Sequence, residues 1–466
     1  MQLFRRFTIK KFYLEKLNSP YDQFGLFKLL STRYNKIFIL ESLVGPKDLS
    51  EFSIIGFDPE LTVTCDREKF RITNQEGQTE ETEISDPLSQ LRGLIPVVQD
   101  NRFRYLGGAV GYVCYDAVRF WEKLPPMRLK KPDYPMLEFG IFTDGILYNH
   151  VAKQAYYFSI RQKPRSKELK EILYEERVRY GPSGFWYSTP KRTLSKKDFV
   201  KKVTKSKKYI QRGDIYQVVL SKKMKFTIRG DMLNVYERLR EINPSPYMCF
   251  FRMDERHILG SSPEMLLRIT GNLIETFPIA GTRPVSKDAK RNRDLRMELL
   301  RDEKEIAEHT MLVDLARNDL GRVSKYGTVR VKELMKVKKF SHVQHMISHV
   351  TGILREGYDS QDALRAVFPA GTVSGAPKVR AMEIIDELEQ NFRGPYAGAL
   401  GYFSCNGSCD FAISIRSVFT NRGEAFIQTG AGIVMDSDPD KEWMETEHKA
   451  SALLRALQET KIGTKS

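Results

Sequence analysis

The sequence predicts an α+β fold built on antiparallel sheet. Up to Ser159 it is rich in short strand-like runs, such as KIFIL, FSIIGF and AYYFSI, and helical periodicity is scarce. From Asp198 onward, strands such as IYQVVLSKKMKFTI alternate with helices such as MLNVYERLREI. This order is not a regular βαβ repeat, so antiparallel sheet is favoured over a doubly wound parallel fold.

The composition is that of an ordinary globular protein. The chain has 466 residues, 41% hydrophobic and 11% aromatic, which is enough for two domains with large cores. No stretch is long and apolar enough to span a bilayer, and the basic N-terminus lacks the apolar segment of a signal peptide, so we expect a cytoplasmic protein without a membrane partner. A reducing location also fits the five cysteines, which are odd in number and lack C-x-x-C spacing: Cys65, Cys114, Cys249, Cys405 and Cys409.

The net charge of +16 raises nucleic acid as a partner. The basic residues are mostly interleaved with acidic ones, and the most one-sided stretches carry no nucleic-acid motif. We therefore expect no nucleic-acid partner and an anionic small substrate instead. A basic, non-catalytic nucleic-acid binder is the alternative from another class of protein.

A charged segment with Pro and Gly, residues 161–197, connects two regions of different composition. The N-terminal region comprises residues 1–165 and the C-terminal domain residues 196–458. No internal repeat or low-complexity tract is present.

Two predicted helices carry carboxylates where an apolar face should run. In the stretch 301–322, Asp302 and Glu305 indicate a capping box, and Glu305 and Glu308 share a face with Leu312. Capping explains Glu305 equally well, but Glu308 lies a full turn further in. Because a buried unpaired charge is costly, Glu308 should have a cation, a metal or a ligand nearby.

The second such helix opens at Asp438-Pro439, with Glu442 and Glu445 three residues apart. If the two helices meet, one carboxylate from each would suit Mg²⁺, which takes one or two protein carboxylates and keeps several waters. Periodicity alone does not show that they meet, and solvated surface glutamates remain the alternative.

Two glycine-rich stretches resemble nucleotide motifs without matching them. GTVSGAPK at 371–378 lacks the pattern of a P-loop, and TGAGIVMD has Met435 where a Rossmann motif needs its third glycine. Residues 430–432 leave the backbone accessible, and Gly371-Thr372 precedes a helix predicted to start at 374–377 with free N–H groups. Both stretches suit carboxylates, although ordinary tight turns would look the same.

Together these motifs resemble the chorismate-utilising enzymes. The resemblance runs from about Leu40 to Leu457 and is densest after Asp198; it rests on the two acidic helices, the glycine-rich stretches and the motifs ILES (39–42), GYVCYD (111–116), GDIYQVVLS (213–221), NPSPYM (243–248), SSPEMLL (261–267), PIAGTRP (278–284) and RGPYAGALGYF (393–403). It implies two antiparallel sheets sandwiching helices. It also implies a Mg²⁺-dependent lyase that converts chorismate and ammonia to anthranilate and pyruvate in tryptophan biosynthesis.

The resemblance assigns roles to individual residues. Glu308 and Glu445 would hold Mg²⁺, with Glu305 and Glu442 steadying its waters. Four residues would be catalytic: Glu264, His345, Gln217 and Thr372. Glu264 would protonate the departing C4 hydroxyl, and His345 is associated with the loss of pyruvate. The substrate's carboxylates would be held by Gly281, Thr282, Tyr396, Arg416, Gly430, Ala431 and Gly432. From the pattern alone, a satisfied core histidine would explain His345 as well.

Gln217 indicates the nucleophile. Relatives that add water carry a lysine here, whereas glutamine cannot titrate, and ammonia needs no deprotonation before attack. The chain lacks a glutamine-amidotransferase signature, so a separate glutamine amidotransferase subunit should supply ammonia within a hetero-oligomer, a heterotetramer. The nearest alternative is the para-directing aminodeoxychorismate synthase component I, whose PIKGT replaces the PIAGT that contains Ala280 here.

The resemblance also implies feedback inhibition by tryptophan. It places the inhibitor site at Ser42, Pro246, Tyr247 and Met248 and makes residues 1–165 a regulatory region. Without the resemblance, Glu41-Ser42 would be simply the end of a strand.

Overall fold

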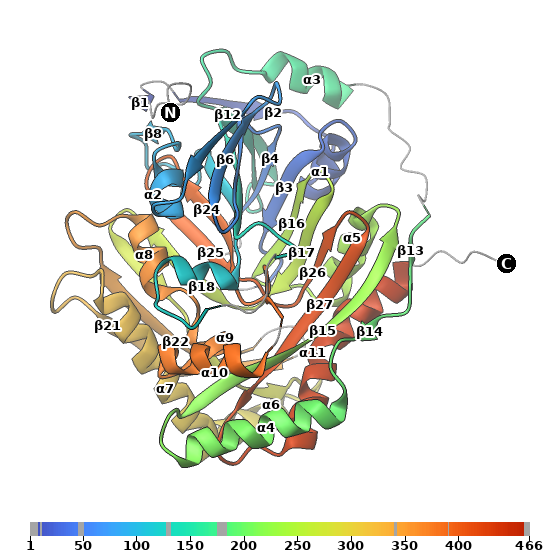
Figure 1. The fold of residues 1–466 in the computed structure, drawn as a ribbon. Helices are drawn as coiled ribbons and strands as arrows, with labels where there is room; N and C mark the ends of the chain where they lie inside the picture. Colours follow the sequence, from blue (N-terminus) through green and yellow to red (C-terminus); the bar gives the residue numbers. More distant parts are fainter. Residues whose placement is uncertain are drawn as a thin grey trace.

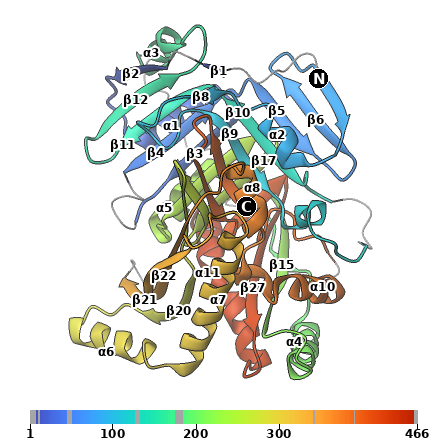
Figure 2. The same cartoon turned by 90° about the vertical axis from the view of Figure 1, so that its left-hand side faces the viewer.

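The computed structural model describes residues 8–9, 12–44, 51–126, 132–174, 184–339, 343–389 and 391–460. Two large sheets, one of 12 and one of 13 strands, are antiparallel throughout. The predicted α+β class with antiparallel sheet is therefore confirmed. Figures 1 and 2 show the N-terminal strands in the upper half of the molecule and the long C-terminal helix in the lower half.

The 12-stranded sheet mixes strands from both parts of the chain. In spatial order it contains β20 (Ile279–Pro284), β22 (Val343–Ile353), β19 (Leu273–Thr276), β18 (Met265–Thr270), β25 (Cys409–Ile413), β24 (Ala399–Ser404), β9 (Gly108–Val113), β10 (Leu137–Phe142), β5 (Leu61–Cys65), β6 (Lys69–Asn74) and β7 (Thr79–Glu83), with β21 (Arg330–Lys339) also paired to β22. Strand β9 lies between β24 and β10, so the N-terminal region is hydrogen-bonded to the C-terminal domain.

The 13-stranded sheet is shared in the same way. Its order is β13 (Trp186–Tyr187), β15 (Gln217–Arg229), β27 (Glu424–Ile433), β26 (Ser417–Asn421), β17 (Arg256–Ser262), β16 (Tyr247–Met253), β3 (Lys36–Glu41), β4 (Phe52–Phe57), β11 (Asp144–Asn149), β12 (Gln154–Ser159) and β2 (Tyr13–Leu17), with β14 (Lys191–Arg192) and β23 (Gly375–Ala376) on β15. Here β16 and β3 join the two regions. A separate parallel pair joins β1 (Thr8–Ile9) to β8 (Val97–Val98).

The helices pack around these sheets. They are α1 (Gln23–Ser31), α2 (Pro87–Arg92), the 3₁₀ helix η1 (Tyr115–Phe120), α3 (Ser166–Tyr174), α4 (Lys196–Gln211), α5 (Met232–Ile242), α6 (Ala289–Leu299), α7 (Glu303–Gly321), α8 (Ser360–Val367), α9 (Gly371–Ser374), α10 (Lys378–Leu388) and α11 (Pro439–Thr460). Helices α1, α5 and α11 share one apolar core with the 13-stranded sheet, whereas a second core joins both sheets with α7, α8 and α10. Within the described residues, no helix has the length and apolar character needed to cross a membrane.

Aspartate caps mark the first residues of the two acidic helices. Asp302 caps α7 by accepting a hydrogen bond from the backbone N–H of Glu305 at 3.2 Å, which is one half of the predicted capping box. Asp438 accepts from the N–H groups of Asp440 and Lys441 at 3.0 and 2.9 Å at the start of α11. The helix start predicted at 374–377 is wrong, because Gly375 and Ala376 form β23 and α10 begins at Lys378.

Candidate active site

The carboxylates of the two acidic helices converge. Glu305 and Glu308 lie on α7, and Glu442 and Glu445 lie on α11. Burial is the main reason that the pKa of Glu308 is raised, and the charges of the other three carboxylates raise it further. Burial and the neighbouring Glu445 likewise raise the pKa of Glu442. The carboxylates of the two helices are therefore close enough to interact electrostatically, which periodicity alone did not show.

Two lysines partly balance this negative charge. Lys304 Nζ lies 3.8 Å from Glu308 Oε1, and Lys449 Nζ lies 2.5 Å from Glu445 Oε1. Among the described residues, no three His, Cys, Asp or Glu side chains are arranged as a metal cage. Mg²⁺ does not need such a cage, because it keeps several waters and binds through one or two carboxylates. An all-oxygen donor set in which the pKa values of Glu308 and Glu442 are raised fits a hard divalent cation.

Glu264 is the most strongly perturbed carboxyl group near these helices. It follows β17, is only 8% exposed, and burial raises its pKa to about 8. Thr372 and the Lys449 ammonium act in the opposite direction. Glu264 and Thr372 also line one small cavity of about 40 Å³, with apolar neighbours such as Leu312 and Ile413. At neutral pH this side chain is therefore a protonated acid that can donate a proton.

Arg416 and Tyr396 are linked to Lys449 by direct contacts and through Gly430. Arg416 Nη1 donates to the Lys449 carbonyl at 3.2 Å, and Lys449 Nζ donates to the Gly430 carbonyl at 2.9 Å. A Cβ on Gly430 would lie 2.7 Å from the Tyr396 hydroxyl and 2.9 Å from the Leu220 carbonyl oxygen. Residue 430 must therefore be a glycine for the Tyr396 hydroxyl to reach β27. The Arg416 guanidinium and the Tyr396 phenol together suit the binding of a carboxylate.

His345 closes the site from β22. Its Nδ1 lies 2.9 Å from Thr282 Oγ1 and 3.3 Å from the Gly281 carbonyl oxygen. Burial lowers the pKa of His345 and the Arg416 charge lowers it further, so the imidazole is neutral at neutral pH. Gly281 has φ of 67° at a bulge in β20, and a Cβ there would lie 3.2 Å from Glu305 Oε2. This close approach connects the histidine to the carboxylate cluster.

Gln217 and the residues 430–432 meet across β15 and β27. A Cβ on Gly432 would lie 2.2 Å from Gln217 Nε2, so the glutamine side chain lies directly against the glycine. Gln217 is buried, and its Oε1 has no hydrogen-bond partner among the described residues. Ala431 packs with Ile215 and Trp443 in a separate core, because alternation along the strand turns its methyl group away from the face of Gly432. Only the Ala431 backbone is available to the site.

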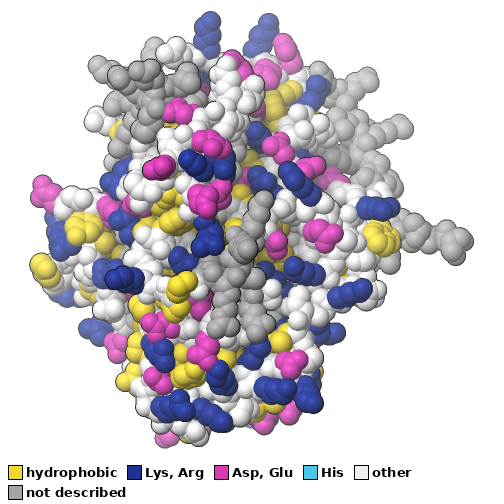
Figure 3. Space-filling view, viewed as in Figure 1, with side chains coloured by type: hydrophobic (Ala, Val, Ile, Leu, Met, Phe, Trp, Pro, Cys, Tyr) yellow, Lys and Arg dark blue, Asp and Glu magenta, His cyan; other side chains and the backbone are white. Residues whose placement is uncertain are grey.

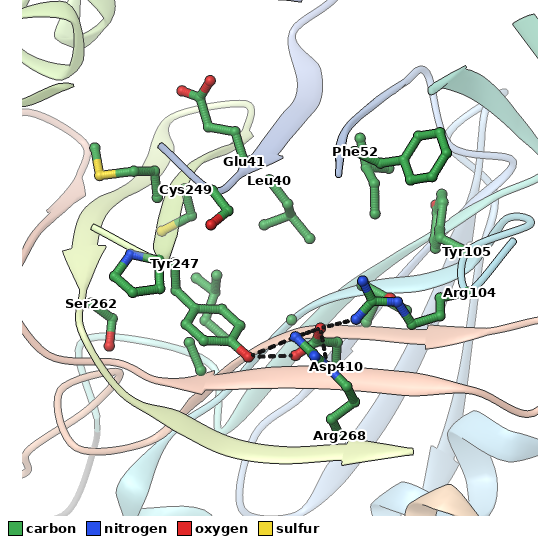
Figure 4. Close-up of a pocket in the computed structure, with 18 of the residues that line it drawn as sticks. Leu40, Glu41, Phe52, Arg104, Tyr105, Tyr247, Cys249, Ser262, Arg268 and Asp410 are labelled. Carbon is green, nitrogen blue, oxygen red and sulfur yellow. Dashed lines mark hydrogen bonds and ion pairs between the residues drawn. The ribbon is translucent and has the colours of Figure 1, made fainter. Parts of the chain in front are cut away.

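The predicted inhibitor residues line a different cavity. Ser42, Pro246, Tyr247 and Met248 all border a space of about 410 Å³ between the two sheets. Figure 4 shows Tyr247 pointing toward Asp410 at one end of this cavity, where Arg268 and Arg104 also lie. Glu41 points away from that cluster.

The polar end of the cavity is a buried ion-pair cluster that the sequence did not indicate. Asp410 accepts from Arg268 Nε at 2.9 Å and from the Tyr247 hydroxyl at 3.1 Å, and Arg104 Nη1 lies 3.6 Å from it. These partners are far apart in the chain. Lys449 was also not identified from the sequence as a site residue, although its position four residues after Glu445 on one helix could have indicated an ion pair.

Comparison with known proteins places this geometry in a family. The sequence matches the family described as chorismate binding enzyme over residues 37–455. It is 47% identical to anthranilate synthase component 1 from Methanothermobacter marburgensis, covering 94% of this chain and 93% of the relative. The crystal structure of anthranilate synthase component I from Streptococcus pneumoniae TIGR4 superimposes with a TM-score of 0.75 at 33% identity, covering 88% of this chain and 94% of that one.

A more distant structure agrees in fold alone. The menaquinone-specific isochorismate synthase from Escherichia coli has a TM-score of 0.71 at 21% identity, covering 96% of this chain and 94% of that chain. The sheet order, the converging carboxylates and the sequence match over nearly the whole chain agree with one another. This chain belongs to the chorismate-binding enzyme family.

Proposed function

We propose that this chain is the component of anthranilate synthase that converts chorismate and ammonia to anthranilate and pyruvate. The observation that carries the proposal is Glu264, a buried carboxyl group with a pKa of about 8 that interacts with Lys449, the ion-pair partner of Glu445. An acid that stays protonated at neutral pH is what the loss of a hydroxyl group requires. The name of the 47% identical relative supports the same reaction.

Glu308 and Glu445 would hold Mg²⁺, which when bound supplies positive charge to the ring carboxylate of chorismate. Arg416 and Tyr396 would hold a substrate carboxylate from the opposite side. In the first step Glu264 gives its proton to the C4 hydroxyl, which leaves as water while ammonia bonds to C2. Because the Gln217 Oε1 atom has no hydrogen-bond partner within the described part of the chain, it can accept a hydrogen bond from the incoming ammonia and orient it.

The neutral His345 suits the second step, the elimination of pyruvate. Its ring is oriented by Thr282 and the Gly281 carbonyl oxygen, and a neutral imidazole can take up or pass on a proton. Ala280 lies on β20 between the strand start and Gly281. Its methyl group would leave C2 open to ammonia, which favours the ortho product over the para product of aminodeoxychorismate synthase.

The partners follow from the same proposal. Component 1 in the relatives' name implies a second component, here a glutamine amidotransferase that delivers ammonia in the cytoplasm. Acidic and basic side chains are interspersed over the face seen in Figure 3, which supports the absence of a nucleic-acid partner.

Tryptophan is the proposed inhibitor, and the cavity of about 410 Å³ is its proposed site. That volume lies within the usual range for small ligands. The charged cluster at Asp410 suits the ammonium and carboxylate groups of an amino acid, and the walls include Phe52 and Leu40 for an aromatic ring. Residues 1–165 supply much of the wall, which supports their regulatory role.

The test is turnover of chorismate with Mg²⁺ and an ammonium salt at alkaline pH, followed by the fluorescence of anthranilate. Metal-dependent fluorescence is the expected result. Consumption of chorismate with formation of the para-aminated product would favour the alternative enzyme instead. Salt-dependent retention on heparin without any metal-dependent turnover would favour the nucleic-acid binder.

A further inference from the structure

Arg393 is the largest side chain enclosed in the described part of the protein, with 1% of its surface exposed. Its Nε donates to Glu389 Oε2 at 2.8 Å and its Nη2 to Glu389 Oε1 at 2.7 Å. Nη1 donates to the Val373 carbonyl and Nη2 also to the Val219 carbonyl, each at 2.7 Å. One guanidinium thus connects α10, α9 and β15.

Two of the three segments held by Arg393, α9 and β15, carry a residue of the proposed site. Val373 directly follows Thr372, and Val219 lies two residues after Gln217 on β15. The guanidinium carbon also lies 5.9 Å from the centre of the Tyr396 ring. Strand alternation gives Gln217 and Val219 the same face, so a shift of the Val219 carbonyl would move Gln217 with it.

The turn that contains Arg393 is also held from the N-terminal region. Asp116 Oδ2 accepts from the Gly394 N–H at 2.7 Å, and the Tyr115 N–H donates to the Gly394 carbonyl at 2.9 Å. Lys223 Nζ donates to the Phe392 carbonyl at 2.5 Å. The backbone is therefore held on both sides of Arg393. A neighbouring side chain cannot easily move in to make the hydrogen bonds of Arg393 if that residue is replaced.

Burying a charge is expensive, and a buried pair is often no more stabilising than apolar residues of the same volume. The arrangement at Arg393 is better explained by geometry, because its planar fork makes bonds in three directions at once. We propose that Arg393 is a positioning residue that fixes Thr372, Gln217 and Tyr396 relative to one another. The inference rests on the proposed function, because it assigns these three residues to one site.

The test is Arg393→Lys, which keeps the positive charge but cannot form the fork. With saturating ammonium, kcat/KM for chorismate should fall at least tenfold, through a higher KM as Tyr396 shifts and a lower kcat as Gln217 and Thr372 shift. If this variant does not fold, Glu389→Gln decides instead. It keeps one acceptor for the guanidinium and should lower kcat/KM severalfold.

The matched control is Arg165→Lys. Arg165 donates from Nε and Nη2 to the two oxygens of Asp144, both at 2.9 Å, and Asp144 is 0% exposed. This change should lower the unfolding temperature but leave kcat and KM unchanged. Wild-type kcat and KM in the Arg393 or Glu389 variant, or an equal kinetic loss in the Arg165 variant, would overturn the inference. Failure of the proposed function would show separately, as absence of anthranilate from the wild-type protein.

Discussion

Glu264→Gln should remove activity and yet make the protein more stable at neutral pH. Glutamine has nearly the same shape as a protonated glutamate, but it cannot donate an acidic proton to the C4 hydroxyl. The gain in stability follows from linkage, because burial raises the pKa of Glu264 from its ordinary value of 4.5 to about 8.

The sign and size can be worked out from these two pKa values. Below pH 4.5 the carboxyl group is protonated in both the folded and the unfolded protein. Between the two values the unfolded protein releases this proton and the folded protein keeps it, so unfolding becomes more favourable by about 1.4 kcal/mol per pH unit. The loss is roughly 3 kcal/mol at pH 7 and reaches roughly 5 kcal/mol above pH 8, where both states are ionised.

The assay is urea unfolding of both proteins at pH 5, 6, 7 and 8. Other titrating groups are shared, so they cancel in the difference between variant and wild type. That difference should grow by roughly 4 kcal/mol from pH 5 to pH 8 in favour of the glutamine variant. Glu424→Gln, at an exposed position on β27, should instead stay parallel to wild type. A difference for Glu264→Gln that does not change with pH would refute a raised pKa and the acid role built on it.

Four further substitutions test the proposed metal site, inhibitor cavity and ammonia path. Glu308→Gln and Glu445→Gln should each abolish turnover, and each should also abolish the rise in unfolding temperature that Mg²⁺ causes, because each removes a ligand charge. Glu303→Gln, at an exposed position on the helix of Glu308, should have neither effect. Normal activity of the Glu308 or Glu445 variant at modest Mg²⁺ would contradict the metal site. Ser42→Phe should relieve tryptophan inhibition by filling the cavity while chorismate turnover stays nearly unchanged, and inhibition curves that superimpose on wild type would count against it. Ala280→Lys should collapse anthranilate formation by placing a competing amine in the path of ammonia, with an enzyme adduct visible by intact mass; unchanged output would mean that Ala280 does not line the path to C2.

The α+β fold could be predicted because its signals are local. Short alternating runs marked the strands, and the Asp302 and Asp438 caps marked the starts of α7 and α11. The error at residues 374–377 has a physical cause. Gly375 has φ of 134°, and a Cβ there would lie 2.2 Å from the Gln217 carbonyl oxygen, so this segment pairs as a strand rather than starting a helix. That contact depends on a distant strand and leaves no local pattern.

The site was predictable only in part. The E-x-x-E spacing indicated which carboxylates share a helix face, and the structure brings the carboxylates of the two helices within electrostatic reach of one another. Their meeting, the raised pKa of Glu264 and the cluster at Asp410 all depend on contacts between segments distant in sequence. The roles of the individual site residues stay predictions until the variants are measured.

The shared sheets limit how this protein could be made insensitive to an inhibitor. Deleting residues 1–165 would expose the edges of β24 and β16, which now pair with β9 and β3. Unpaired edges of this kind promote aggregation. A form resistant to the proposed tryptophan inhibition should therefore come from single substitutions in the cavity wall, and a shortened chain should be insoluble.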